Sequence, residues 1–74
     1  MDRTLVLEHL AQTERHVAQG VERLAKQEAI VTDLERDGHD TKWAEVLLAT
    51  MRETHSLHLQ DRERLLNELA AHPT

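Results

Sequence analysis

The chain has 74 residues, of which 39% are hydrophobic and 31% charged, and its net charge is −5. This composition is typical of one small folded domain and is too apolar for a disordered chain. The absence of cysteine excludes disulfides, thiolate nucleophiles and cysteine-based zinc sites. The acidic balance, without a cluster of Lys and Arg, argues against binding to nucleic acid or to an anionic membrane.

No apolar run approaches the roughly 18 residues that a membrane-spanning helix needs. The first residues, Met1 to Thr4, lack the basic and then apolar layout of a signal peptide. We therefore expect a cytoplasmic protein that does not insert into membranes.

The first helix is predicted over residues of about 3–36, with Asp2 or Thr4 as its N-terminal cap. Its pattern advances in alternating steps of four and three residues, as the buried seam of a coiled coil does. The seam comprises Val6, Leu10, Thr13, Val17, Gly20, Leu24, Gln27, Val31 and Leu34. Leu7, Val21 and Ile30 flank the seam and widen the apolar stripe, which favours a bundle over a two-stranded coil.

A turn is predicted at residues of about 37–40, between the two helical patterns. Gly38 suits the end of the first helix, because glycine enters the left-handed backbone region without a clash of its Cβ. Asp40 or Thr41 can then cap the second helix. A connection this short makes the two helices antiparallel.

The second helix is predicted over residues of about 41–71, and Pro73 marks its end. Its seam shows the same alternation and comprises Ala44, Leu48, Met51, His55, His58, Arg62, Leu65 and Leu69. Leu47, Leu59 and Leu66 flank it. The fold class is therefore all-α, an antiparallel two-helix hairpin.

Folding about the turn implies that facing residues have numbers adding to about 77. This rule places Gly20 opposite Leu57 and His58, where it leaves room for a larger side chain. Trp43 is expected near Leu34, as a packing plug at the turn end of the hairpin.

The middle of the seam is polar, and it admits two interpretations. Buried polar groups are costly unless they are hydrogen-bonded, but they can fix helix register and oligomeric state. Alternatively, the heptad frame drifts and these residues face water. The residues concerned are Thr13, Gly20, Gln27, His55, His58 and Arg62.

Wide apolar stripes on both helices predict a partner, because two packed helices cover only one side each. The simplest closure is a homodimer in which two hairpins form a four-helix bundle about a twofold axis. The alternative is an open hairpin that recruits a helix from another protein.

Six histidines are many for a chain of this length. His55 and His58 are three residues apart, so they share a helix face and could bind one metal ion, with His16 or Glu14 as a third ligand. Histidine also changes charge between pH 5 and 8, which would make the bundle pH-responsive. No Glu-x-x-His or His-Glu-x-x-His motif occurs, so the alternative is solvated or hydrogen-bonded imidazoles, such as His16 with Asp61 and His9 with Glu68.

Catalytic patterns are missing. Ser56 is the only serine and has no base at a spacing that would activate it. The two glycines, Gly20 and Gly38, cannot make a phosphate-binding loop. We therefore expect no enzyme and no cofactor, but a small interaction or structural module that self-associates through its heptad-like apolar faces.

Three stretches carry a resemblance to known proteins: Thr13-Glu14-Arg15-His16-Val17, the turn from Leu34 to Thr41, and Leu57-His58 followed by Asp61-Arg62. Through them, most of the chain resembles a group of small bacterial helical-hairpin proteins that have no assigned activity. The resemblance implies a natural bacterial hairpin and adds no functional residue.

Overall fold

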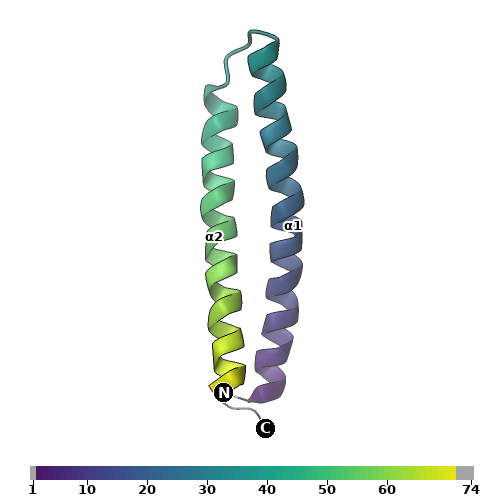
Figure 1. Cartoon of the computed structure of the whole chain (residues 1–74), viewed down its shortest axis with the longest axis vertical. Helices are drawn as coiled ribbons and strands as arrows, with labels where there is room; N and C mark the ends of the chain where they lie inside the picture. The colour runs from purple at the N-terminus through teal and green to yellow at the C-terminus, as the bar shows by residue number, and fades with distance from the viewer. Residues whose placement is uncertain (1, 72–74) are drawn as a thin grey trace.

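In a computed structural model that describes residues 2–71, the chain forms two long helices, α1 (Arg3–Arg36) and α2 (Lys42–Ala71). The helices lie side by side and antiparallel, joined by one short turn (Figure 1). They form a rod of 57 × 14 × 14 Å. The predicted all-α hairpin is confirmed.

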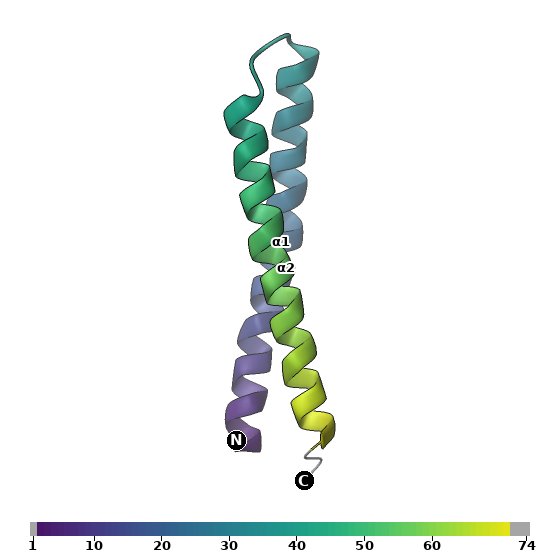
Figure 2. The ribbon, with the colours of Figure 1, turned by 90° about the vertical axis from the view of Figure 1, so that its left-hand side faces the viewer.

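The two helices wrap around each other. Seen from the side, α2 crosses in front of α1 near the middle of the rod (Figure 2). This shallow crossing is the geometry in which a seam with alternating steps of four and three residues stays between two helices.

The start of α1 is fixed by Asp2. Its side-chain Oδ1 accepts a hydrogen bond from the backbone N–H of Thr4 at 3.0 Å, and its carbonyl accepts from the N–H of Val6 at 3.1 Å. The carboxylate therefore satisfies one of the free N–H groups of the first turn and lies at the positive end of the helix dipole.

The end of α1 is a Schellman motif centred on Gly38. The N–H of Gly38 donates to the Glu35 carbonyl at 3.1 Å, and the N–H of His39 donates to the Leu34 carbonyl at 2.9 Å. Gly38 has φ of 74°, a left-handed conformation that other residues adopt only at a cost. The motif thus ends the helix and satisfies two carbonyls of its last turn.

The start of α2 uses both residues that the sequence proposes as caps. Asp40 Oδ1 accepts from the N–H of Lys42 at 2.9 Å, while the Thr41 carbonyl accepts from the N–H of Glu45 at 2.8 Å. The helix therefore begins at Lys42, one residue after the position of about 41 expected from sequence. Pro73, the predicted end signal, lies outside the described residues.

The core is the seam between the helices. All members of the two alternating patterns are buried or half-buried, including the polar ones. The fully buried residues are Val6, Thr13, Val17, Gln27, Val31, Leu48 and Leu65. The polar middle therefore lies in the seam between the helices, with Thr13 and Gln27 buried and the others half-buried.

The prediction that Trp43 packs near Leu34 is wrong. Trp43 is 77% exposed and does not plug the turn end of the hairpin. The neighbouring Ala44 occupies the seam position, and one residue along a helix rotates a side chain by about 100°. The Lys42 Nζ lies 5.8 Å from the centroid of the exposed Trp43 ring.

Candidate functional site

Two helices packed together leave the two flanks of their seam exposed. The ion pair between Arg52 and Glu28 shows which residues of α1 and α2 lie on the same flank. Arg52 Nη2 lies 3.7 Å from Glu28 Oε1, so these residues of α2 and α1 share one side. Residues seven apart return to the same side of a coiled-coil helix. The stripes through Glu28 and Arg52 define what we call the leucine face: Leu7, Glu14, Val21, Glu28, Glu35, Glu45, Arg52, Leu59 and Leu66.

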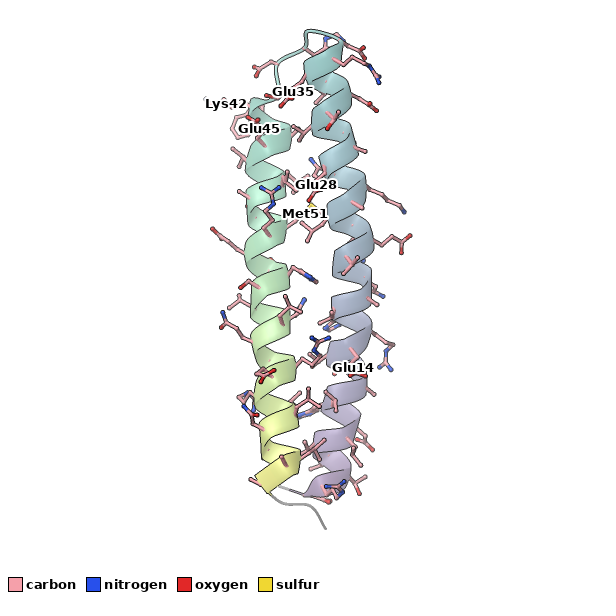
Figure 3. The ribbon with its side chains drawn as sticks, in the orientation of Figure 1. Glu14, Glu28, Glu35, Lys42, Glu45 and Met51 are labelled. Atoms are coloured by element: carbon pink, nitrogen blue, oxygen red, sulfur yellow. The ribbon has the colours of Figure 1, made fainter. Side chains whose placement is uncertain are left out.

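The leucine face is divided along its length. Its four aliphatic side chains, Leu7, Val21, Leu59 and Leu66, are 37–58% exposed and lie in the half away from the turn, where Glu14 is the acidic residue among them. The half nearer the turn is acidic, as Figure 3 shows with Glu28 and Glu35 on α1 and Glu45 on α2.

The opposite side carries the histidines. A groove of about 150 Å³ opens there, and its lining includes His16 and Arg23 from α1 with Thr54 from α2. Along the heptad stripes through His16 and Thr54 lie the residues of what we call the histidine face: His9, His16, Arg23, Ile30, Leu47, Thr54, Asp61 and Glu68. Among the described residues, no carboxylate lines the 150 Å³ groove, although the chain is acidic.

His16 and His58 meet across the two helices. Their ring centroids are 4.9 Å apart, and the ring planes are tilted by 36°. His16 is exposed on the histidine face, whereas His58 belongs to the seam and is half-buried. The structure therefore pairs His58 with a histidine of the other helix, and not with His55 on its own helix as the spacing of three residues suggests.

His55 points into the seam against Gly20. A Cβ built on Gly20 would lie 3.1 Å from Cε1 and 3.3 Å from Cγ of the His55 ring, and closer still to Nδ1. The sequence correctly places a large side chain opposite Gly20, but the side chain is that of His55 and not those of Leu57 and His58. Leu57 is 63% exposed.

The Nδ1 atom of His55 is buried without a hydrogen-bond partner among the described residues. A buried polar atom left unpaired costs about 1–3 kcal/mol. The ring of this half-buried imidazole packs against Gly20 and leaves Nδ1 unpaired within residues 2–71.

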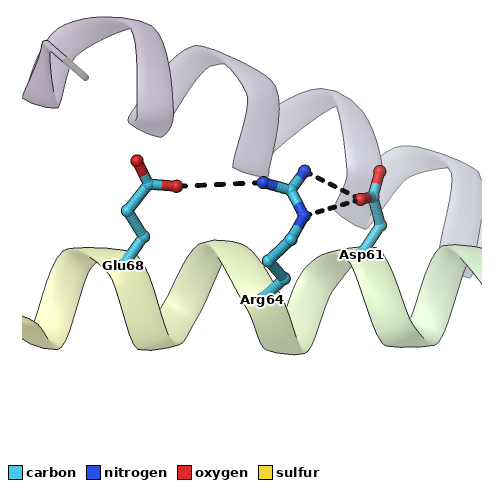
Figure 4. Close-up of polar contacts among 3 residues, drawn as sticks. All are labelled: Asp61, Arg64 and Glu68. Carbon is cyan, nitrogen blue, oxygen red and sulfur yellow. Dashed lines mark hydrogen bonds and ion pairs between the residues drawn. The ribbon is translucent and has the colours of Figure 1, made fainter.

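The carboxylates expected beside the histidines bind Arg64 instead (Figure 4). Arg64 donates from Nη2 and Nε to Asp61 Oδ1 at 2.8 and 3.3 Å, and its Nη1 lies 3.8 Å from Glu68 Oε2. The expected pairs of His16 with Asp61 and of His9 with Glu68 do not form. Arg64 lies three residues after Asp61 and four before Glu68, so it reaches both without crossing to α1.

Gln27 ties the helices together near the turn. Its Nε2 donates to the backbone carbonyl of Ala44 at 3.0 Å, and the Gln27 side chain is buried. This bond satisfies a buried amide across the seam and joins one turn of α1 to the first turn of α2. The heptad pattern placed Gln27 in the seam and left open whether it is buried or solvated, and no sequence signal identified its partner.

The remaining ion pairs lie at the surface. Lys26 Nζ and Glu22 Oε1 are 3.3 Å apart, as their spacing of four residues predicts, and Arg36 Nη2 is 3.2 Å from Asp33 Oδ1. Exposed pairs of this kind contribute less than about 1 kcal/mol each. They do not build a site.

Within residues 2–71, no group of three or more His, Cys, Asp or Glu side chains is arranged to hold a metal ion. The expected three-ligand arrangement of His55, His58 and His16 is therefore not assembled. Glu14, the other possible third ligand, lies on the leucine face. Over the same residues, neither helix has an apolar stretch that would let it cross a bilayer.

No protein-family model, curated protein or solved structure matches the chain. The functional argument therefore depends on the two open faces and the contacts beneath them.

Proposed function

We propose that this chain is a non-catalytic interaction module that pairs with a second copy of itself to form a four-helix bundle. The observation that carries the proposal is the leucine face. Four aliphatic side chains share one side of a rod only 14 Å thick, where the hairpin's own helices leave them 37–58% exposed. Burying a Leu or Val side chain stabilises a structure by about 1.5–3 kcal/mol, so a second copy on this face supplies the core that one hairpin lacks.

The distribution of charge supports an antiparallel pairing. If both turns pointed the same way, Glu28, Glu35 and Glu45 of one copy would face the same carboxylates of the other. Arg52, the basic residue of this face, is already paired with Glu28. With the twofold axis perpendicular to the rod, the aliphatic halves overlap and the two acidic halves extend in opposite directions. Such an interface is closed, because each copy uses the same patch.

The test is the mass of the protein in solution. We expect analytical ultracentrifugation to give a dimer for the native chain and a monomer for Leu59→Glu, since the substitution places a carboxylate in the apolar half of the interface. Leu47→Glu is the matched control, because Leu47 is a similarly exposed leucine of α2 on the histidine face. A dimer that survives Leu59→Glu, or dissociates with Leu47→Glu, would refute the choice of face.

The direction of pairing has a separate test. A spin label at Asp40 marks the turn of each copy. The antiparallel arrangement predicts a label-to-label distance longer than the 57 Å rod, whereas a parallel bundle brings the two turns close together.

A native chain that is a monomer at all concentrations would favour the alternative partner, a helix of another protein seated on the leucine face. The second candidate function, a response to pH or to metal ions, is favoured by the contact between the His16 and His58 rings. A cytoplasmic setting remains part of the proposal, as does the absence of nucleic-acid binding, which the net charge of −5 supports.

A further inference from the structure

We propose that His16 and His58 form a two-histidine site for a divalent late transition-metal ion, which joins α1 to α2 at the middle of the hairpin. The inference deepens the second candidate function and does not depend on self-association. It is based on the contact between the two rings, their accessibility and the separation of the two residues along the chain.

The ring geometry suits a shared metal ion. Two imidazoles that bind one tetrahedral Zn²⁺, each through a nitrogen about 2.1 Å from the metal, have ring centroids roughly 5 Å apart. The observed centroid separation of His16 and His58 is 4.9 Å. A shared ion requires one nitrogen of each ring to turn toward it, at a centroid separation close to the observed one.

The surroundings leave the site open to water and ions. His16 is exposed, and both rings line a groove that also includes His9 and Asp61. The structure provides two protein ligands, so water completes the coordination. Asp61 is engaged by Arg64 at 2.8 Å, which removes it as a ready third ligand.

The donor type selects the metal. Imidazole nitrogen suits Zn²⁺, Ni²⁺ and Cu²⁺, whereas Mg²⁺ and Ca²⁺ require oxygen ligands. With two protein ligands, the site would bind these ions reversibly and respond to their supply.

Binding would stabilise the hairpin because it joins distant parts of the chain. His16 and His58 belong to different helices, so a shared ion closes a long loop that includes the turn. Ions that bind the folded state in preference to the unfolded chain raise the melting temperature. This stabilisation does not require a second copy, because both protein ligands come from one chain.

The first experiment is thermal unfolding with Zn²⁺ as the probe, compared with Mg²⁺. We expect Zn²⁺ to raise the Tm of the native chain by about 5 °C or more, and Mg²⁺ to have no effect. His16→Gln should abolish the shift while leaving the Tm without metal nearly unchanged, because His16 is exposed. His39→Gln is the matched control, an exposed histidine in the turn, and should retain the full shift.

A second measurement locates the ion. Substoichiometric Ni²⁺ should broaden the NMR signals of the His16 and His58 rings before those of the other histidines. Equal broadening of all histidines, or a Zn²⁺ effect that persists in His16→Gln, would show that the two rings only pack against each other. Sedimentation of His16→Gln should match that of the native chain, so this inference and the proposed dimer succeed or fail separately.

Discussion

Gly20 is the residue at which α1 makes room for a side chain of α2. An alanine would normally strengthen a helix by about 1 kcal/mol over glycine. Here the new Cβ would come within 3.1 Å of the His55 Cε1 and closer to Nδ1, so the ring or the helices would have to move. At this position helix propensity therefore favours alanine, whereas packing against His55 favours glycine.

This opposition gives a prediction for a pair of variants. Gly20→Ala should lower the free energy of unfolding by about 1–3 kcal/mol in the native chain. In a His55→Ala background, the same change should raise it by up to about 1 kcal/mol, because only the helix preference remains. Urea denaturation of the four proteins at one concentration measures the coupling. An effect of Gly20→Ala that is the same in both backgrounds would contradict the contact.

At the scale of the elements, Gly38 determines where α1 stops. Its φ of 74° lies in the left-handed region, and a Cβ added there would have nothing within 4 Å. Any other residue at this position would therefore lower stability through the backbone conformation that it must adopt, and not through a clash with a neighbouring side chain. Gly38→Ala should destabilise the hairpin by about 1–2 kcal/mol.

Gly38→Asn is the informative comparison, because asparagine enters the left-handed region more readily than alanine. Thermal unfolding should rank the native chain first, the Gly38→Asn variant second and the Gly38→Ala variant last. If the two variants were equally destabilised, the left-handed conformation would not be the source of the cost.

Much of the element scale could be predicted from sequence. The alternation of four and three residues identified the seam, and Gly38 with Asp40 identified the turn, because these signals depend on local geometry. The partners across the seam could not be predicted with the same accuracy. A simple count from the turn placed Gly20 against Leu57 and His58, whereas the ring that contacts it is that of His55.

Trp43 shows a different limit. The pairing rule placed Trp43 near Leu34 and suggested a plug, but the heptad frame gives the inward position to Ala44, and the indole ring remains exposed. The sequence placed His16 near the level of His55 and His58, as a possible third ligand, but did not identify the direct contact of the His16 and His58 rings, which joins a flanking position to a seam position. Sequence spacing shows which residues share a face of one helix. It does not show how the two helices are rotated relative to each other, which decides the contacts between them.

At the scale of the whole molecule, one hairpin is a thin structure with a small core. Among residues 2–71, five hydrophobic residues are buried, whereas ten large hydrophobic side chains are exposed. Single cores in chains of this size contribute at most about 3–5 kcal/mol of stability. Association through the leucine face should therefore supply much of the stability of the fold.

If a dimer is the stable form, the melting temperature must depend on protein concentration. We expect the Tm of the native chain to rise by roughly 4–5 °C for each tenfold increase in concentration. Leu59→Glu should have a lower Tm that does not change with concentration. Circular dichroism over a wide range of concentration measures this, and a constant Tm for the native chain would mean that the hairpin is stable as a monomer.

The single turn at one end of the rod also determines how the hairpin responds to force. Arg3 and Ala71 lie at the same end, opposite the turn (Figure 1). Tension between them loads the seam one layer at a time, beginning at the open end with Val6 and Leu69 and reaching the layers near the turn, with Val31, Leu34 and Ala44, last. The hairpin would thus open like a zipper, layer by layer, whereas two helices pulled from opposite ends would have to break all their layers together.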